Sequence, residues 1–272
     1  MPFYQLKSAN DYLYHYTRAG TLLSKILPSR CLRMVAMTTT NDPRESKDWM
    51  FGFGTDATFD GVTGKQFSEL EKEATTIAKN NCKVVCFTRD GPRGVGFEID
   101  GIYDRGFCKP RMWAQYADNH TGVCLIFDLA KLRETVRASV PDTSVLYEGD
   151  VHYRNRSRAP SLADNPFILN FDAIRRAGLE VTVRDHVRHY WRELFFEKLR
   201  DWGDEKEYRW VLWDTQHDQH LFDFKDSLVA ILLGPSFAAS DKPAVRDFQK
   251  DLGFEVSVLN WKNGVPEILP TF

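Results

Sequence analysis

The stretch that decides how this chain folds is Asp204-Glu205-Lys206-Glu207-Tyr208-Arg209-Trp210-Val211-Leu212-Trp213. Its second half is a short apolar run rich in aromatic residues, which is typical of a buried strand. Two acids one residue apart, Glu205 and Glu207, enter that strand. Side chains of an extended segment alternate between its two faces. The spacing therefore predicts that both carboxylates point to one face.

These two carboxylates have two interpretations. Glutamate is disfavoured in strands, and a glutamate that faces a core needs a partner. Arg209 lies on the same predicted face, so a structural ion pair would explain the pattern. The chemical alternative is that Glu207 orients a ribose hydroxyl and stabilises positive charge on the adjacent sugar carbon, as carboxylates do in glycosidases.

A second strand-like run lies near the N-terminus, at Leu13-Tyr14-His15-Tyr16-Thr17. It carries a histidine and a threonine two residues apart. Taken alone, this run is explained by the edge of a buried strand with a hydrogen-bonded histidine. Together with the paired glutamates, it indicates the kind of site that could cleave a nucleotide.

The order of the predicted elements indicates an α+β fold. Strands are expected at 12–17, 31–37, 83–88, 122–128, 144–153, 207–213, 228–233 and 254–259. Helices are expected at 19–27, 66–80, 181–202 and 244–252. Strands and helices do not alternate regularly, which argues against a doubly wound sheet. We expect a single domain over residues 1–272, with a helical insertion around 154–202.

Composition restricts the function classes. The chain has 272 residues, 43% of them hydrophobic, and a formal charge of −2, so no global field favours nucleic acid or membrane. Residues 151–200 nevertheless hold ten Lys/Arg against six Asp/Glu, a net of +4. An alternative function is therefore a non-catalytic nucleic-acid-binding module that uses this region. Its phosphate contacts would be Arg154, Arg156, Arg158, Arg175, Arg176, Arg184 and Arg188.

Targeting and metal signals are weak. We find no pattern of a signal peptide and no apolar run long enough to span a bilayer, and we expect a cytoplasmic protein without membrane contact. The five cysteines form no Cys-x-x-Cys pair and are expected to be reduced. His186-x-x-His189 and His217-x-x-His220 could each place two imidazoles on one face, which would suit a metal-dependent hydrolase. Neither pair has an obvious third ligand, so we predict no metal site.

Two further groups have ordinary structural explanations as well as functional ones. Asn41, Asp42 and Glu45 belong to Thr40-Asn41-Asp42-Pro43-Arg44-Glu45, a turn in which they can cap a helix. Trp113 and Tyr116 share one face of a predicted helix that ends before Gly122. Such aromatic pairs belong to a core more often than to a ligand site.

As a set, these segments resemble a bacterial family of uncharacterised domains. The motifs that carry the resemblance are Leu13-Tyr14-His15-Tyr16-Thr17, Asn41-Asp42-Pro43-Arg44-Glu45, Val85-Cys86-Phe87-Thr88, Met112-Trp113-Ala114-Gln115-Tyr116 and Glu205-Lys206-Glu207-Tyr208-Arg209. Their order also resembles the ADP-ribosyltransferase superfamily, which includes the poly(ADP-ribose) polymerases and the DarT-type toxins. That resemblance implies a split mixed sheet with helical insertions.

The resemblance also implies an activity, namely NAD-dependent transfer of ADP-ribose to a protein, DNA or RNA acceptor without a metal. It implies that Glu207 is the catalytic residue and that Glu205 influences the choice of acceptor. NAD would be bound by His15, Tyr16, Thr17, Thr88, Trp113 and Tyr116, and the acceptor also by Arg209, Asn41, Asp42 and Glu45. Such enzymes often act as toxins or in phage defence, with an antitoxin or inhibitor as partner.

Overall fold

The computed structural model describes residues 11–47, 49–91, 100–155 and 165–271. Its strands are β1 Tyr12–Thr17, β2 Cys31–Ala36, β3 Gly52–Gly54, β4 Cys82–Thr88, β5 Val123–Asp128, β6 Val145–Asp150, β7 His152–Tyr153, β8 Ile168–Asn170, β9 Glu197–Lys198, β10 Glu207–Trp213, β11 Gln219–Asp223, β12 Leu228–Leu233, β13 Glu255–Lys262 and β14 Val265–Pro270. Its α-helices are α1 Ala19–Thr21, α2 Leu27–Ser29, α3 Pro43–Ser46, α4 Gly64–Asn81, α5 Asp100–Tyr103, α6 Pro110–Tyr116, α7 Leu129–Ser139, α8 Phe171–Ala177, α9 Leu179–Phe195 and α10 Lys242–Leu252.

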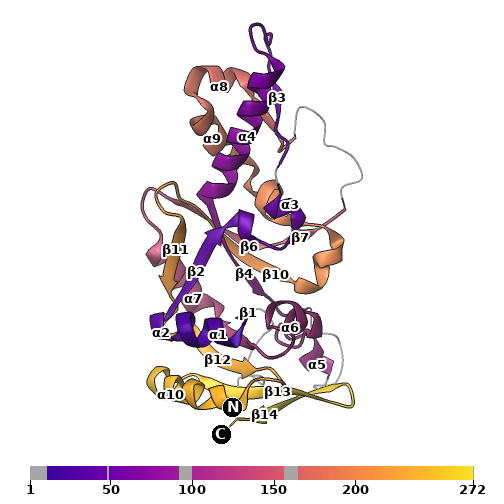
Figure 1. The fold of residues 1–272 in the computed structure, drawn as a ribbon, viewed down its shortest axis with the longest axis vertical. Coiled ribbons are helices and arrows are strands. Elements are labelled where there is room, and N and C mark those ends of the chain that lie inside the picture. Colours follow the sequence, from indigo (N-terminus) through magenta and orange to yellow (C-terminus); the bar gives the residue numbers. More distant parts are fainter. Residues whose placement is uncertain (1–10, 48, 92–99, 156–164, 272) are drawn as a thin grey trace.

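Within the described residues, ten strands form one mixed sheet. Its main path runs β11-β2-β4-β1-β5-β12-β13-β14, and β10 pairs with β4 on one side and β6 on the other. The β12–β13 pair is parallel, while the other pairs of this sheet are antiparallel. Figure 1 shows the sheet in the middle of an elongated molecule, with α4, α8 and α9 at one end and α10 at the other. The predicted α+β class with a mixed sheet and helical insertions is confirmed.

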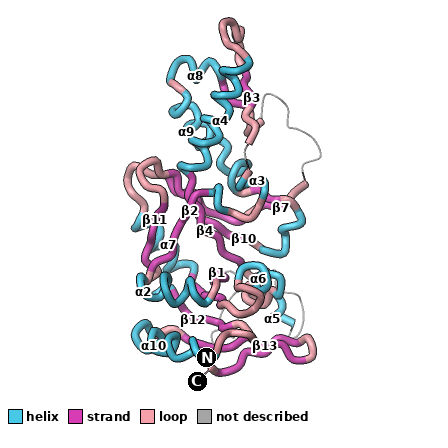
Figure 2. Tube along the Cα trace, in the orientation of Figure 1, coloured by secondary structure: helices cyan, strands magenta, loops and turns pink. Residues whose placement is uncertain are grey.

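Strand β10 lies between two cores because both of its faces are covered. Tyr208, Trp210 and Leu212 belong to one buried cluster. Val211 and Trp213 alternate with them and join a second cluster, to which α4 and α9 contribute. Figure 2 shows these helices packed together beside the sheet. The alternation also places Glu207 and Arg209 on the face of β10 that Val211 and Trp213 share.

Several boundaries differ from the prediction. The helix expected at 181–202 ends at Phe195, because Glu197 and Lys198 pair as a strand with β7. The strand expected at 144–153 divides into β6 and β7, which belong to different sheets. The strands β11 and β14 and the helix α7 were not predicted, since their apolar residues are interrupted by charged ones. Whether residues 1–272 form a single domain stays a prediction.

The described helices include none with the length and apolar character needed to cross a membrane.

Gly106 allows a close contact that supports the pocket-lining strand β1. A Cβ at this position would lie 2.2 Å from Cδ2 of Tyr14 and 3.0 Å from the carbonyl oxygen of Arg89. The Tyr14 side chain is fully buried and has no room to swing away. We therefore expect Gly106→Ala to lower the free energy of unfolding by about 1–3 kcal/mol, measured by urea denaturation.

The matched control is Gly101→Ala in α5, where a Cβ would meet nothing within 4 Å. Equal denaturation midpoints for the two alanine variants would contradict the expected clash.

Candidate active site

The sheet splits between β1 and β2, which share one edge of β4. Strand β2 pairs with the start of β4 at Val84, and β1 pairs with its end through Tyr14 and Thr88. The opposite edge of β4 is paired with β10 along its whole length. Among the described residues, no strand therefore lies beside the edge of β4 between Val84 and Thr88, and a pocket opens there.

The pocket has a volume of about 290 Å³, at the lower limit of the range of ~300–1,000 Å³ that is usual for small-molecule sites. Its lining comes from segments that are far apart in the sequence: β1, β2, the turn before α3, α3 itself, β4, α6, β9 and the residues around the start of β10. The lining residues are Tyr14, His15, Tyr16, Arg33, Val35, Thr39, Thr40, Asn41, Glu45, Val84, Val85, Cys86, Phe87, Thr88, Met112, Tyr116, Lys198, Glu205 and Glu207.

His15 takes the place of the missing strand partner at the split. Its Nδ1 lies 3.0 Å from the carbonyl oxygen of Cys86, which is the residue midway between Val84 and Thr88. A carbonyl only accepts, so this hydrogen bond assigns the proton to Nδ1 and leaves a lone pair on Nε2. Burial lowers the pKa of His15, which keeps the ring neutral at pH 7. A neutral imidazole of this tautomer accepts a hydrogen bond from a ligand hydroxyl.

Glu207 lies between two cations. Its Oε2 is 2.7 Å from Nζ of Lys198, and its Oε1 is 2.5 Å from Nη2 of Arg209. Burial by itself raises the pKa of Glu207, but Arg209 and Lys198 outweigh it and lower the pKa from 4.5 to about 2. The thiol of Cys86 adds a further hydrogen bond to this carboxylate. Glu207 is therefore ionised at neutral pH.

Arg209 links Glu207 to a second buried acid. Its Nη1 lies 2.6 Å from Oε1 of Glu45 and donates to the carbonyl of Phe195 at 2.8 Å. The Arg209 side chain is fully buried and does not line the pocket. The structural interpretation of this arginine, as the ion-pair partner of Glu207, matches its contacts. It holds the carboxylate in place from behind.

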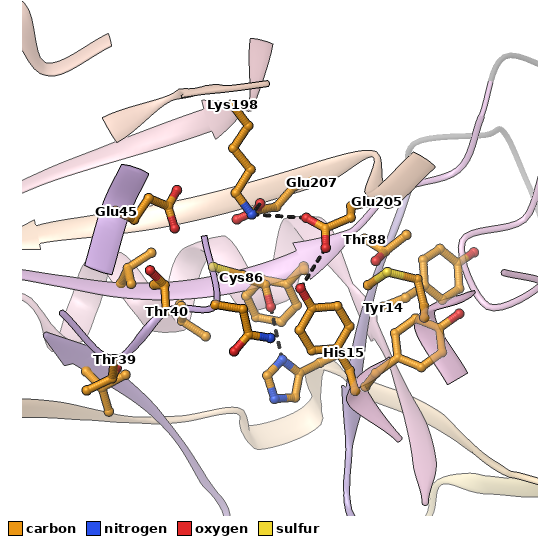
Figure 3. A pocket seen from close by; sticks show the side chains of 18 of the residues that line it. Tyr14, His15, Thr39, Thr40, Glu45, Cys86, Thr88, Lys198, Glu205 and Glu207 are labelled. Atoms are coloured by element: carbon orange, nitrogen blue, oxygen red, sulfur yellow. Dashed lines mark hydrogen bonds and ion pairs between the residues drawn. The ribbon is translucent and has the colours of Figure 1, made fainter. Parts of the chain in front are cut away.

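Glu205 reaches the same cluster along a different backbone path from the one expected. It ends a 3-10 turn, and Lys206 adopts a left-handed conformation with φ of 46° before β10 begins at Glu207. The prediction that both glutamates lie on one face of a single extended strand is therefore wrong. Their carboxylates converge nonetheless, because Lys198 also lies 3.0 Å from Oε2 of Glu205. Figure 3 shows the Lys198 ammonium between the two carboxylates.

Tyr116 closes the cluster on the side of α6. Its hydroxyl donates to Oε1 of Glu205 at 2.6 Å. Both oxygens of Glu205 thus have a donor, one from Tyr116 and one from Lys198. Burial and the neighbouring Glu205 raise the pKa of Tyr116, so its hydroxyl keeps its proton at neutral pH.

Thr88 contributes a buried polar atom that faces the pocket lining. Its side chain is 1% exposed, and its Oγ1 has no hydrogen-bond partner among the described residues. Burying a hydroxyl without a partner is unfavourable, so such an atom is suited to bind a ligand. Thr88 is also the residue opposite Glu207 in the β4–β10 pair.

Eight of the twelve predicted site residues line this pocket. They are His15, Tyr16, Asn41, Glu45, Thr88, Tyr116, Glu205 and Glu207. Thr17, Asp42, Trp113 and Arg209 are buried outside the lining. Asp42 caps α3 by accepting from the backbone N–H of Arg44, as its capping interpretation requires.

Trp113 lies behind the pocket. It is fully buried, donates to the carbonyl of Phe107 at 2.8 Å and packs edge-on against Tyr16. Tyr16 in turn donates to the carbonyl of Gly106. Trp113 therefore supports the pocket wall and does not form its surface.

The two cationic lining residues, Lys198 and Arg33, were not predicted from the sequence. Lys198 was hidden because residues 181–202 follow a helical apolar stripe, within which a lysine is expected to be solvated. The signal that could have revealed it is the charged pair Glu197-Lys198 directly after Phe195-Phe196. Arg33 was not predicted, because a single charged residue within a strand usually faces solvent.

Four of the seven arginines predicted to meet phosphate contact other groups of the chain. Arg154 contacts Glu197, and Arg175 donates to the carbonyls of Thr58 and Asp60. Arg184 and Arg188 flank Asp185. Arg156 and Arg158 lie outside the described residues.

The histidine pairs make other contacts. His186 Nε2 bonds to the carbonyl of Pro166, and its ring packs on Tyr190, as does the ring of His189. His217 pairs with Asp214, while His220 bonds to Ser139. No metal-binding group of three His, Cys, Asp or Glu side chains occurs among the described residues.

The buried Glu207 makes stability depend on pH. Its pKa is depressed from 4.5 to about 2 in the folded chain, so its stabilising contribution is complete above pH 4.5 and is lost as the pH falls towards 2. Between pH 7 and pH 3 we expect this residue alone to account for about 2 kcal/mol of lost unfolding free energy. Urea denaturation at both pH values, with wild type and Glu207→Gln, measures it. Equal pH dependence in the two proteins would rule out this assignment.

Comparison with known proteins gives a partial family match and distant structural matches. A family described as a protein of unknown function (DUF2971) matches residues 112–210, from α6 to β10. No curated protein matches the chain.

The structural matches are to DarT of Thermus sp. 2.9. The complex with ADP-ribosylated ssDNA has 11% identity and a TM-score of 0.32, covering 92% of this chain and 96% of that one. The complex with carba-NAD+ has 13% identity and a TM-score of 0.34, with the same coverage of 92% and 96%. The complex with NAD+ has 10% identity and a TM-score of 0.33, covering 93% and 97%. TM-scores this low say nothing about the activity of this chain. Its function is therefore inferred from its own residues.

Proposed function

We propose that this protein is an NAD-dependent ADP-ribosyltransferase. The observation that carries the proposal is that His15 of β1 and Glu207, the first residue of β10, line the same pocket at the split of the sheet. One supplies a neutral acceptor and the other a carboxylate that stays ionised. This is the pairing that cleavage of a nucleoside bond requires, because a ribose must be held while positive charge develops on its anomeric carbon.

The contacts support a role for each residue in this proposal. Glu207 holds a hydroxyl of the reacting ribose and stabilises the developing charge. The Nε2 atom of His15 accepts a hydrogen bond from a second ribose hydroxyl. Tyr16 and Thr88 form the wall of the pocket around the substrate. Of these two residues, Thr88 is the better candidate for a hydrogen bond to the substrate, since its buried hydroxyl has no partner within the described residues. Trp113 and Thr17 support this wall from the core.

The reaction breaks the bond between nicotinamide and ribose and forms a bond from the same ribose carbon to a nucleophile of the acceptor. Nicotinamide leaves as a neutral molecule with the bonding electron pair, and the acceptor loses a proton. Glu205 lies beside the reacting position, where it can influence acceptor choice, together with Asn41 and Glu45. Glu205 must first exchange a hydrogen bond from Tyr116 or Lys198 before it can receive that proton.

The acceptor in this proposal is a macromolecule, either a protein or a nucleic acid. A cytoplasmic toxin or phage-defence effector, held inactive by an antitoxin or inhibitor, is the biological role that such an activity would suit. No contact of the described arginines favours the non-catalytic nucleic-acid-binding alternative.

The test is incubation of the purified chain with NAD labelled in its adenylate phosphate. Nicotinamide release is followed by chromatography, and label is sought in added protein, single-stranded DNA and RNA. We expect release together with label in one acceptor class. Release without label would identify a hydrolase, and the absence of both would overturn the proposal.

A further inference from the structure

We propose that Arg33 of β2 forms an anion subsite that binds the diphosphate of the dinucleotide at the mouth of the pocket. This inference rests on the proposed function and deepens it, because it assigns the end of the substrate that does not react. A pocket of about 290 Å³ encloses little more than the reacting end of a dinucleotide. The diphosphate must then lie towards solvent, where it still needs a positive partner.

The pocket lining contains two cationic side chains, Arg33 and Lys198. Lys198 is buried, and its ammonium is already held at 2.7 Å and 3.0 Å by Glu207 and Glu205. Arg33 is exposed, and its guanidinium donates to the side-chain oxygen of Gln219 at 3.3 Å. Arg33 makes no ion pair with an acid among the described residues. Most of its N–H donors are therefore available to an anion.

Other polar groups on this wall are already occupied. The hydroxyls of Thr39 and Thr40 donate to the backbone carbonyls of Ala36 and Met37. The N–H of His15 is used by Cys86, and its remaining nitrogen repels an anion. Arg33 is thus the lining group that combines positive charge with free donors.

The two ends of the split place Arg33 at a suitable distance from the acids. Strand β2 pairs with β4 in antiparallel register at Val35 and Val84, so Arg33 lies two residues closer to the end of β4 where Thr88 pairs with Glu207. The remaining two residues of extended strand span about 7 Å. An extended arginine side chain and the part of a dinucleotide from ribose to phosphate together bridge such a distance. The pocket therefore has an acidic end for the sugar and a cationic end for the phosphates.

The test uses the full chain with Arg33→Gln and the matched control Arg30→Gln, an exposed arginine outside the lining. Binding of ADP is measured by calorimetry, and kcat and KM for NAD are measured by nicotinamide release. We expect Arg33→Gln to weaken ADP binding by about 10–100-fold and to raise KM for NAD with little change in kcat. Arg30→Gln should behave as wild type. The salt dependence of ADP binding should also become shallower in Arg33→Gln.

Each outcome separates this inference from the proposed function. Cleavage of NAD with an unchanged KM in Arg33→Gln would overturn the subsite alone. ADP binding that depends on Arg33, without any cleavage of NAD, would support the subsite and overturn the transferase. If Arg30→Gln weakens ADP binding as much as Arg33→Gln does, the effect is one of overall charge and the subsite is overturned. Failure of the wild type to bind ADP would also overturn the subsite.

Discussion

Replacing Glu207 by glutamine is expected to lower kcat for nicotinamide release by about 10²–10³-fold, the effect usual for loss of one preorganised electrostatic contact to a transition state. Glutamine retains the shape and a carbonyl acceptor but lacks the negative charge that opposes the charge on the ribose carbon. Because ground-state contacts to a hydroxyl remain, KM for NAD should change much less. Steady-state assays of nicotinamide release measure both constants.

Folding must be controlled in this experiment, because Glu207 is also the partner of Lys198 and Arg209. Circular dichroism and the thermal midpoint of Glu207→Gln would show whether the loss of rate exceeds any loss of folded protein. Glu134→Gln, an exposed substitution on α7, is the matched control and should retain full activity. If Glu207→Gln folds and has the kcat of wild type, Glu207 is not the catalytic residue. Its role would then be limited to the ion pairs with Lys198 and Arg209.

Arg209→Met is expected to have the largest effect on stability, lowering the free energy of unfolding by about 3–5 kcal/mol. The guanidinium is fully buried and contacts Glu45 and Glu207 directly. Its removal leaves two buried carboxylates with Lys198 as the nearest remaining cation. Methionine fills a similar volume, so the loss measures charge and hydrogen bonding more than packing. Urea denaturation at pH 7 provides the measurement.

Two variants sharpen this result. Arg209→Lys keeps the charge but lacks the planar fork that reaches both acids and the Phe195 carbonyl, so its stability should be intermediate. Arg18→Met removes an exposed arginine and should leave stability within about 0.5 kcal/mol of wild type. If Arg209→Met were as stable as Arg18→Met, the buried cluster would not hold Glu207 in the way its contacts imply.

Local sequence patterns predicted the strands that carry the site well. The boundaries of β1 and β10 agree with the prediction, since each is a short apolar run between turn residues. The stretch around Lys198 was predicted wrongly, because its apolar spacing suits a helix while its pairing with β7 is a long-range contact. Local spacing carries no information about such a partner. The prediction for Glu205 was wrong for a different reason. Lys206 has a left-handed backbone conformation, which the pattern of apolar and polar residues around it does not reveal.

Local sequence patterns were sufficient for β1, β10, the mixed class of the fold and the unusual polar residues His15, Glu205 and Glu207. Those features depend on neighbours within a few residues. The contacts of Glu205 and Glu207 depend on how distant segments pack in the folded chain. The two acids converge on Lys198 because β9, the turn at Arg200–Glu205 and β10 meet beside the split between β1 and β2. Charge pairing in a buried cluster depends on distances of a few ångströms between segments far apart in the chain, and spacing along the sequence does not encode those distances.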